Sequence, residues 1–549
     1  MEVQVKDRTQ DLLEFHNQLY AISDNPGKKV AFLAVVLAAV LAVVLLLFPV
    51  IRNSLEDIAV SREFAPTSGI SAVEEEVLQE PWEKNVLMKL ERASDYWTDA
   101  ETKPFLRGPI TRGQVASVTF LDSLDTASQD AWDVSQAQDG SVMAWAVESG
   151  ALYEVYIGAE GGINAKYCYK LFSNCKNLSS ITFNDSFHTD YTDCMCHMFS
   201  YTSLTSLDLS NFVTSSVTDM TGMFWSSSFT SLDLSSFDTS LVTDMSDMFS
   251  NSESLRELDI SSFDTSSVTN MSGMFDDNTS LISLDLSHFD TSNVTDMSAM
   301  FRNTENLQQL DISGFDTSSV SDMSHMFFDC DVKALDLSSF DTSLVTDMGG
   351  MFMGTKSLTM LDLSSFDTSS VTNMSNMFCY SGVTALDLSH FDTANVTSME
   401  DMFGGTDSLA ELDISGFDTS AVMSMRNMFF RTALTNLDLS HFDTSAVVTM
   451  SSMFQATHSL KQLDISSFDT GNVTDMSYMF YGSSIQQLDV SGFNTSNVRN
   501  MHSMFNGCKS LNKILGITNW NTSNVTDYED FMDKGKSIDG KPWEKLFEK

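Results

Sequence analysis

The strongest constraint on the fold is a sequence unit of 25 or 26 residues that recurs along most of the chain. Met-Phe pairs mark its copies, and successive pairs are 25 or 26 residues apart throughout. The pairs begin at Met198, Met223, Met248, Met274, Met300, Met326, Met351, Met377, Met402, Met428, Met453, Met479 and Met504. A fixed period of this length is typical of proteins that stack one small structural unit many times.

Each unit has three parts with different hydrophobic patterns, and the copy at residues 284–301 shows all of them. It begins with Leu-Asp-Leu-Ser, whose apolar and polar residues alternate as in a short strand. Asp-Thr-Ser follows, and these side chains favour a turn. Val294, Met297, Met300 and Phe301 then recur at i, i+3, i+6 and i+7, which predicts a helix of about two turns.

A single unit cannot fold alone, because its eight or so apolar side chains contribute roughly 2 kcal/mol each when buried. Ordering about 25 residues costs more than that. The sequence therefore predicts an α/β solenoid, a right-handed coil with one parallel β-sheet face. The methionines are interpreted as adaptable core packing rather than as a copper or haem site.

A small polar residue or a cysteine stands three places after the phenylalanine of many units. Such a column in one register predicts an inward hydrogen-bonding ladder. Its members are Thr202, Ser227, Asn278, Thr304, Thr355, Ser381, Cys175, Cys330 and Cys508.

The repeat resembles that of BspA-like leucine-rich-repeat surface proteins, in the wording S-L-D-L-S-S-F-D-T-S-x-V-T-D-M-S-x-M-F over residues 109–535. The resemblance implies a leucine-rich-repeat-like solenoid on a bacterial surface, with adhesion as its role. Many relatives carry a lipid or cell-wall anchor. This sequence shows neither a lipid-modified cysteine after its apolar stretch nor a wall-sorting pattern, so we expect an N-terminal helix to be the anchor.

That anchor is predicted at residues 30–51, which are 22 residues without a charge. A helix of roughly 20 apolar residues spans a bilayer. More Lys and Arg precede the segment than follow it, which predicts a cytoplasmic N-terminus and a repeat region outside the cell. A cleaved signal peptide and a buried core helix are the alternatives, although the apolar stretch is long for both.

The remaining segments have their own patterns. Residues 1–29 are predicted to be a cytoplasmic tail and 52–108 a partly helical stalk, with a helix at 72–99 that is broken at Pro81. Residues 109–165 alternate as strands do at 115–121, 141–147 and 151–157, with Gly150 in a hairpin turn between the last two, which predicts an N-terminal β cap. The solenoid is expected over 166–535, and 536–549 form a C-terminal tail suited to cap its other end.

The charge is strongly acidic: 75 Asp and Glu stand against 30 Lys and Arg, a net charge of −45. Such a chain lacks the basic surface that phosphate binding needs, so nucleic acid is excluded as a partner. Many of the acidic residues are aspartates at one outward strand position of successive units. We interpret this column either as weak Ca²⁺ ligands or as solvated carboxylates that accept hydrogen bonds from neighbouring serines. The column comprises Asp208, Asp233, Asp259, Asp285, Asp311, Asp336, Asp362, Asp387, Asp413, Asp438, Asp464 and Asp489.

Other candidate sites are weak. His288, His390 and His441 share one register, but they lie coils apart, too far to share a metal. The sequence Ser-His-Phe-Asp is repeat wording, and no catalytic motif is present, so we expect no enzyme, no cofactor and no catalytic residue. Four cysteines cluster near the cap and could form a disulfide, bind zinc or remain buried thiols: Cys168, Cys175, Cys194 and Cys196.

One outward position, two residues before the strand aspartate, varies from unit to unit. Its members are Glu257, Gln309, Met360, Glu411, Asn436 and Gln487. Variation on an exposed face is expected of a recognition surface, so the sequence predicts a binding or adhesion module for an extracellular protein or glycan. The alternative is a structural spacer or envelope-coat element without a specific ligand.

Overall fold

The computed structural model describes residues 84–90, 100–538 and 541–548. All described residues belong to one compact unit, Gln79–Lys549. The predicted membrane helix at 30–51 lies outside the described residues. Within them, no helix is long and apolar enough to cross a membrane.

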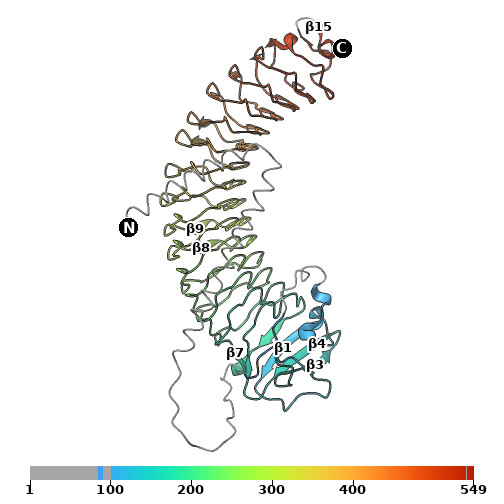
Figure 1. Cartoon of the computed structure of the whole chain (residues 1–549), viewed down its shortest axis with the longest axis vertical. Coiled ribbons are helices and arrows are strands. Elements are labelled where there is room, and N and C mark those ends of the chain that lie inside the picture. Colours follow the sequence, from blue (N-terminus) through green and yellow to red (C-terminus); the bar gives the residue numbers. More distant parts are fainter. Residues whose placement is uncertain (1–83, 91–99, 539–540, 549) are drawn as a thin grey trace, which may run out of the picture. The chain divides into compact units, whose positions relative to one another are not determined.

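The N-terminal part of the described chain is a five-stranded sheet in the order β2-β3-β4-β1-β6 (Figure 1). Its strands are β1 (Val115–Leu121), β2 (Trp132–Asp133), β3 (Met143–Ser149), β4 (Leu152–Gly158) and β6 (Ser180–Thr182). Strands β3 and β4 form the antiparallel hairpin that the alternation predicts, and Gly150 supplies the positive φ of 71° in its turn. Strand β1 pairs in parallel with β6, which joins this cap to the first coil.

The described part of the predicted stalk has no helix at 84–90 and two short 3-10 helices at Ala100–Thr102 and Phe105–Arg107. Val86 pairs with Asn164 and Leu87 with Ser135 in isolated bridges, so this segment pairs with the cap. Leu87 is fully buried, as is Phe105, and both belong to the core. The helix predicted at 72–99 is therefore wrong at 84–90, because an apolar run this short suits either structure and the cap offers it backbone partners.

Short 3-10 helices and four further strands complete the cap and the ends of the array. They are η2 (Ala100–Thr102), η3 (Phe105–Arg107), η4 (Arg112–Gln114), β5 (Ile163–Asn164), η5 (Asn184–Ser186), β7 (Phe187–His188) and η6 (Ile517–Asn519). At the C-terminal end, β14 (Ser537–Ile538), β15 (Lys541–Pro542) and η7 (Trp543–Phe547) follow. Trp543 and Phe547 bury their rings there, so the predicted tail does cover the last coil.

The predicted short strands form in some of the coils, whereas the equivalent residues of others, such as 207–209 and 335–337, form none. The strands are β8 (Ser283–Asp285), β9 (Gln309–Asp311), β10 (Ala385–Asp387), β11 (Glu411–Asp413), β12 (Gln487–Asp489) and β13 (Lys513–Leu515). Strands of successive coils pair in parallel with identical positions opposite each other, for example Leu284 with Leu310. Among the described residues this face holds strand pairs rather than the one continuous sheet that we predicted.

The predicted helix of the repeat is wrong: between residues 166 and 535 the described chain contains no α-helix. In the coil of Met297, the backbone instead alternates between tight turns and hydrogen bonds to the next coil. The Met300 N–H closes a turn on the Met297 carbonyl at 3.3 Å, and Ala299 has a φ of 54°. The Phe301 N–H donates to the Met326 carbonyl of the next coil at 2.9 Å.

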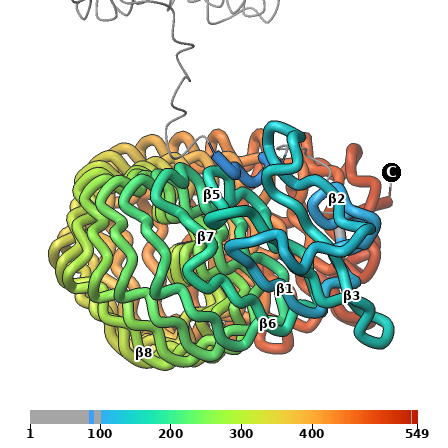
Figure 2. Tube along the Cα trace, turned by 90° about the horizontal axis from the view of Figure 1, so that it is seen from below, coloured from blue at the N-terminus to red at the C-terminus, as the bar shows by residue number. Residues whose placement is uncertain are grey.

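This segment carries a second parallel ladder, which is the more continuous of the two. Isolated bridges join one residue per coil through Cys194, Asp219, Asp244, Asn270, Asp296, Asp322, Asp347, Asn373, Ser398, Ser424, Thr449, Asp475, Asn500 and Asp527. Figure 2 shows the successive coils following one another in register. A neighbouring coil in register satisfies backbone groups that a helix would have satisfied internally, which is why the i, i+3 spacing misleads.

The core between the two ladders repeats in every coil. Val294, Met297, Met300 and Phe301 are all fully buried, so the prediction is right about these apolar residues and wrong about their backbone. Phenylalanine rings of successive coils stack, as Phe275 does on Phe301 with centroids 5.8 Å apart. Flexible methionines fill the space beside these rings, as the sequence predicts.

Candidate functional site

The strand face exposes the six variable positions predicted as a binding surface. Glu257, Gln309, Met360, Glu411, Asn436 and Gln487 are all exposed. Met360 is 80% exposed, which is unusual for an apolar side chain of this size. All six residues therefore lie on one accessible surface beside the column of strand aspartates.

Each strand aspartate in this column is held by the serine two residues later. In the unit of Asp285, Oδ1 accepts hydrogen bonds from the Ser287 backbone N–H at 3.0 Å and from its hydroxyl at 2.7 Å. Hydrogen bonds to the ionised form lower the pKa of the Asp285 carboxyl. The same contacts lower the pKa of Asp208, Asp233, Asp259, Asp336, Asp362, Asp387, Asp438, Asp464 and Asp489.

These carboxylates do not converge on a cation. Among the described residues, a single group of three His, Cys, Asp or Glu side chains has its ligand atoms within 4.8 Å of one another, and it contains no strand aspartate. Calcium normally takes six to eight oxygen ligands. The structure therefore arranges the column as a row of separately held charges, with one carboxylate per coil.

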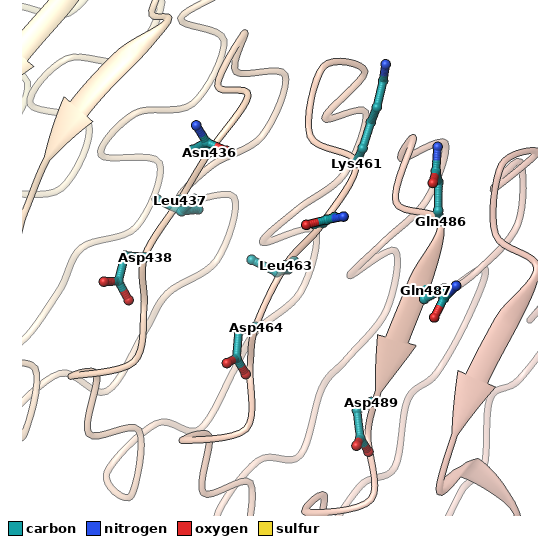
Figure 3. Close-up of a pocket in the computed structure, with 10 residues that line it drawn as sticks. Asn436, Leu437, Asp438, Lys461, Leu463, Asp464, Gln486, Gln487 and Asp489 are labelled. Carbon is teal, nitrogen blue, oxygen red and sulfur yellow. The ribbon is translucent and has the colours of Figure 1, made fainter.

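A shallow groove of about 610 Å³ lies on the strand face across three successive coils (Figure 3). The amides of Asn436, Gln462, Gln486 and Gln487 line it together with Lys461. Figure 3 shows Asp438, Asp464 and Asp489 in a row along the same strands. Two of the six variable positions, Asn436 and Gln487, meet at this groove, which the sequence alone did not single out.

The predicted column of small polar residues is buried, but it forms no continuous ladder. Thr304 typifies it: the side chain is fully buried, and its hydroxyl donates to the Phe301 carbonyl of its own coil at 2.7 Å. Contacts between coils occur at Ser227, whose hydroxyl lies 3.0 Å from that of Ser252. The column therefore mainly closes a turn within each coil.

The inward ladder is formed instead by the threonine of Phe-Asp-Thr, which the sequence suggests only as a turn residue. The Thr291 hydroxyl donates to the Asp316 carbonyl of the next coil at 2.8 Å and accepts from the Asp316 N–H at 2.9 Å. The hydroxyl-to-carbonyl contact recurs at Thr214, Thr239, Thr265, Thr317, Thr342, Thr368, Thr393, Thr419, Thr444, Thr470 and Thr495. In the sequence, the only indication of this ladder is that threonine recurs at the Phe-Asp-Thr position in successive units.

The three register histidines lie apart and each contacts the preceding coil. The Nε2 atoms of His288, His390 and His441 lie 2.9–3.1 Å from backbone carbonyls. A serine elsewhere in that register, Ser467, makes the equivalent contact to the Leu439 carbonyl at 3.0 Å. These histidines therefore link coils, as serine does.

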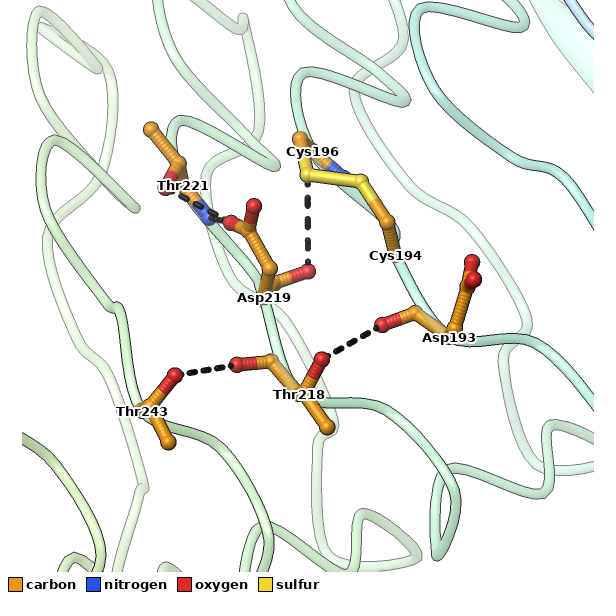
Figure 4. Close-up of a disulfide and its surroundings, with 7 residues drawn as sticks. All are labelled: Asp193, Cys194, Cys196, Thr218, Asp219, Thr221 and Thr243. Atoms are coloured by element: carbon orange, nitrogen blue, oxygen red, sulfur yellow. Dashed lines mark hydrogen bonds between the residues drawn. A yellow bond between two sulfur atoms is a disulfide. The ribbon is translucent and has the colours of Figure 1, made fainter. Parts of the chain in front are cut away.

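The cysteine cluster separates into two environments. Cys194 and Cys196 form a largely buried disulfide in the first complete coil (Figure 4). Cys168 and Cys175 are fully buried thiols, and burial raises their pKa to about 12 and about 11 respectively. The structure therefore does not bring the four cysteines together as the ligands of one zinc ion.

A family model described as "Mycoplasma protein of unknown function, DUF285" matches the repeat region. The matches lie at residues 166–281, 256–360, 323–437, 351–462, 405–513 and 430–544, and together they span more than half of the chain. No curated protein matches the chain.

A solved structure described as "Crystal structure of TLR13-ssRNA13 complex" is similar to part of the chain. It is 12% identical, and the match covers 64% of this chain and 57% of that chain, with a TM-score of 0.13. This chain thus spans 57% of the length of that relative. The low TM-score gives no basis for comparing the two folds or their ligands.

Proposed function

This chain belongs to the DUF285 family of repeat proteins, and we propose that it is a non-enzymatic binding module whose strand face holds a ligand outside the cell. The observation that carries the proposal is the groove across residues 436–489, where variable positions lie beside fixed aspartates. A repeat array presents such a surface at constant spacing, so substitutions at the variable positions alter recognition without disturbing the core.

The chemistry of the groove favours a neutral or basic polyhydroxylated ligand such as a glycan. Asn436, Gln462, Gln486 and Gln487 offer both donors and acceptors, as hydroxyl groups require. Aromatic side chains, which dominate the energetic centres of protein interfaces, do not line this groove. The row of ionised aspartates beside it repels sulfated or sialylated polymers.

We further propose that residues 30–51 anchor the chain in the membrane with the array outside, in the manner of the BspA-like surface proteins that the repeat resembles. The uncharged length of 22 residues supports this anchor. In that arrangement the strand face would meet ligands of other cells or of the envelope.

The test compares two identical Gln-Leu-Asp strands. Gln487 of β12 lines the groove, whereas Gln309 of β9 occupies the same position in a coil that does not line it. We expect the purified chain to bind one class of neutral or amino sugars on a glycan array. Gln487→Ala should weaken that binding about tenfold, the equivalent of roughly 1.4 kcal/mol, whereas Gln309→Ala should leave it unchanged.

Two results would contradict the proposal. Binding that both variants retain in full would exclude the groove as the site. If the chain binds no glycan and instead self-assembles, the spacer or envelope-coat alternative is favoured. If the chain instead binds one protein saturably and Gln487→Ala weakens that binding, the strand face is a binding site but its ligand is a protein rather than a glycan.

A further inference from the structure

The Cys194–Cys196 pair occupies a position that several other coils fill with a hydrogen-bonded Asp-x-Ser or Asp-x-Thr pair. Cys194 bridges to Asp219 of the next coil, so Cys196 corresponds to Thr221. In that next coil, Asp219 Oδ1 accepts from the Thr221 N–H at 3.0 Å and from its hydroxyl at 2.7 Å. In the cysteine coil, Cys194 Sγ accepts from the Cys196 N–H at 3.3 Å. The repeat thus holds the two sulfurs where its regular members hold two oxygens in contact.

A carboxylate of the next coil completes the group. The sulfurs of Cys194 and Cys196 and a carboxylate oxygen of Asp219 all lie within 4.8 Å of one another. Figure 4 shows Asp219 beside the sulfur pair, with Thr221 bound to its carboxylate. A carboxylate oriented by a hydroxyl is the arrangement that supports a metal ligand from behind.

The group borders a cavity. A space of about 440 Å³ is lined by Cys194 and Asp219, with Lys89, Tyr167 and Tyr169 among the other lining residues. Two thiolates and one carboxylate are three protein ligands for a tetrahedral ion, and the fourth position would face this space. Sites with three protein ligands and one open position are typical of zinc that binds water or a small molecule.

We propose that Cys194, Cys196 and Asp219 form a redox-gated zinc site, closed while the disulfide is present and open after its reduction. A low-molecular-weight thiol reduces the disulfide: two thiol molecules become one disulfide, and Cys194 and Cys196 become thiols. Zn²⁺ then displaces one proton from each thiol, forms two Zn–S bonds and accepts the Asp219 carboxylate as its third ligand. The inference is independent of the glycan groove, which lies more than two hundred residues along the chain.

Reduction leaves the fold in place, because this disulfide closes a loop of only two residues' separation. A disulfide stabilises mainly through the length of loop that it closes, so this one contributes little. The backbone of the coil is held independently, since the Met195 N–H donates to the Asp219 carbonyl at 3.0 Å.

The experiment measures zinc binding by the full chain before and after treatment with a phosphine reductant. A thiol assay first verifies that reduction adds two thiols per chain. We expect one zinc per reduced chain and none per oxidised chain. Cobalt in place of zinc should show the charge-transfer absorption of thiolate ligands, which a purely structural role of these cysteines would not produce.

Variants then assign the ligands. Cys194→Ser and Cys196→Ser should each abolish zinc binding, and Asp219→Asn should weaken it at least about tenfold. Cys379→Ser, which removes a buried thiol in another coil, should leave it unchanged. The proposal fails if the reduced chain with two added thiols binds no zinc. It also fails if the oxidised chain or Cys196→Ser binds zinc as well as the reduced wild type does.

Discussion

At the scale of single residues, the buried threonine of Phe-Asp-Thr connects each coil to the next. Thr291 satisfies both the N–H and the carbonyl of Asp316. Burying either group without a partner costs about 1–3 kcal/mol. The Thr291 hydroxyl therefore links neighbouring coils as a ladder hydrogen bond links neighbouring strands. A substitution at this position has to replace both contacts or lose them.

Thr291→Val keeps the shape of this side chain and removes its hydroxyl, so we expect a loss of about 1–3 kcal/mol in stability. The matched control is Thr295→Val in the same coil. Thr295 is exposed, and its hydroxyl contact to the Thr269 carbonyl at 3.1 Å can be replaced by water. Urea unfolding midpoints measure both, and equal midpoints for the two variants would contradict the ladder.

Ionisation of Asp247 opposes folding at neutral pH. Burial and then the nearby charge of Asp276 raise the pKa of Asp247 to about 6, against an ordinary value of 3.8, although Arg302 lowers it. A raised carboxyl pKa means that the folded state holds the proton more tightly. Its contribution to stability is therefore complete below pH 3.8 and is lost as the pH rises to about 6.

We expect Asp247→Asn to raise the melting temperature at pH 7.5, with a gain that shrinks toward pH 4. The control is Asp208, whose pKa is lowered rather than raised. Serine hydrogen bonds lower the pKa of Asp208, so its stabilising effect is present above pH 3.8 and is lost as the pH falls through the lowered value. Asp208→Asn should therefore not stabilise the chain at pH 7.5, and a pH-independent gain for Asp247→Asn would contradict the assignment.

At the scale of elements, the segment after Val-Thr-Asp is the clearest departure from the prediction. Its apolar residues are spaced as on a helix, yet Ala299 has a φ of 54° and the backbone bonds to the next coil. Other coils place Gly222, Gly273 and Gly350 in this register, all with positive φ. Glycine adopts that conformation without the steric cost that alanine has.

Ala299→Gly distinguishes the turn from the helix by the sign of its effect. In the observed turn, relief of the left-handed conformation should stabilise the chain by up to about 1 kcal/mol. In a helix the same substitution would destabilise it by about 1 kcal/mol. Ala385→Gly in strand β10 is the control and should destabilise. Chemical denaturation measures whether each variant is more or less stable than the wild type. Destabilisation by Ala299→Gly would contradict the turn and support a helix at this position.

At the scale of the whole molecule, a buried arginine closes the first coil against the cap. Arg112 is 1% exposed, and its Nη1 donates to the carbonyls of Lys170, Leu171 and Ser173 at 2.7–3.2 Å. In the interior of the array, the carbonyls at the positions of Leu171 and Ser173, such as those of Met223 and Trp225, accept N–H groups of the preceding coil. A solenoid needs such a cap because its terminal coil has a neighbour on one side only.

Arg112→Met should open the first coil and leave distant coils intact. Loss of the charged hydrogen bonds costs about 2–4 kcal/mol locally, and contacts in a solenoid extend only to neighbouring coils. Hydrogen exchange should accelerate at residues 166–190 and stay unchanged at 437–462. Lys176→Met is the control, since its ion pair with Glu101 is exposed and worth little. Uniform acceleration along the array would contradict this view of its cooperativity.

The acidity of the chain is also a property of the whole array. Between residues 200 and 510 the sequence has nine Lys and Arg, whereas aspartates recur in every unit. Serine contacts hold the strand aspartates ionised and separate, so the charge forms a row along the groove-bearing face. We therefore expect the net charge of −45 to repel anionic molecules from this face.

The sequence by itself determined the coil: its period, the position of the short strands that form in some coils, the cap hairpin at Gly150 and the buried identity of Val294, Met297, Met300 and Phe301. These follow from periodicity and turn chemistry, which are local. The tertiary structure alone decided what the backbone groups between those residues bond to. A stacked coil in register offers partners at every position, so the predicted helix becomes a second ladder and a turn threonine becomes the link between coils. The groove and the sulfur-carboxylate group likewise depend on residues of adjacent coils, whose contacts no single repeat contains.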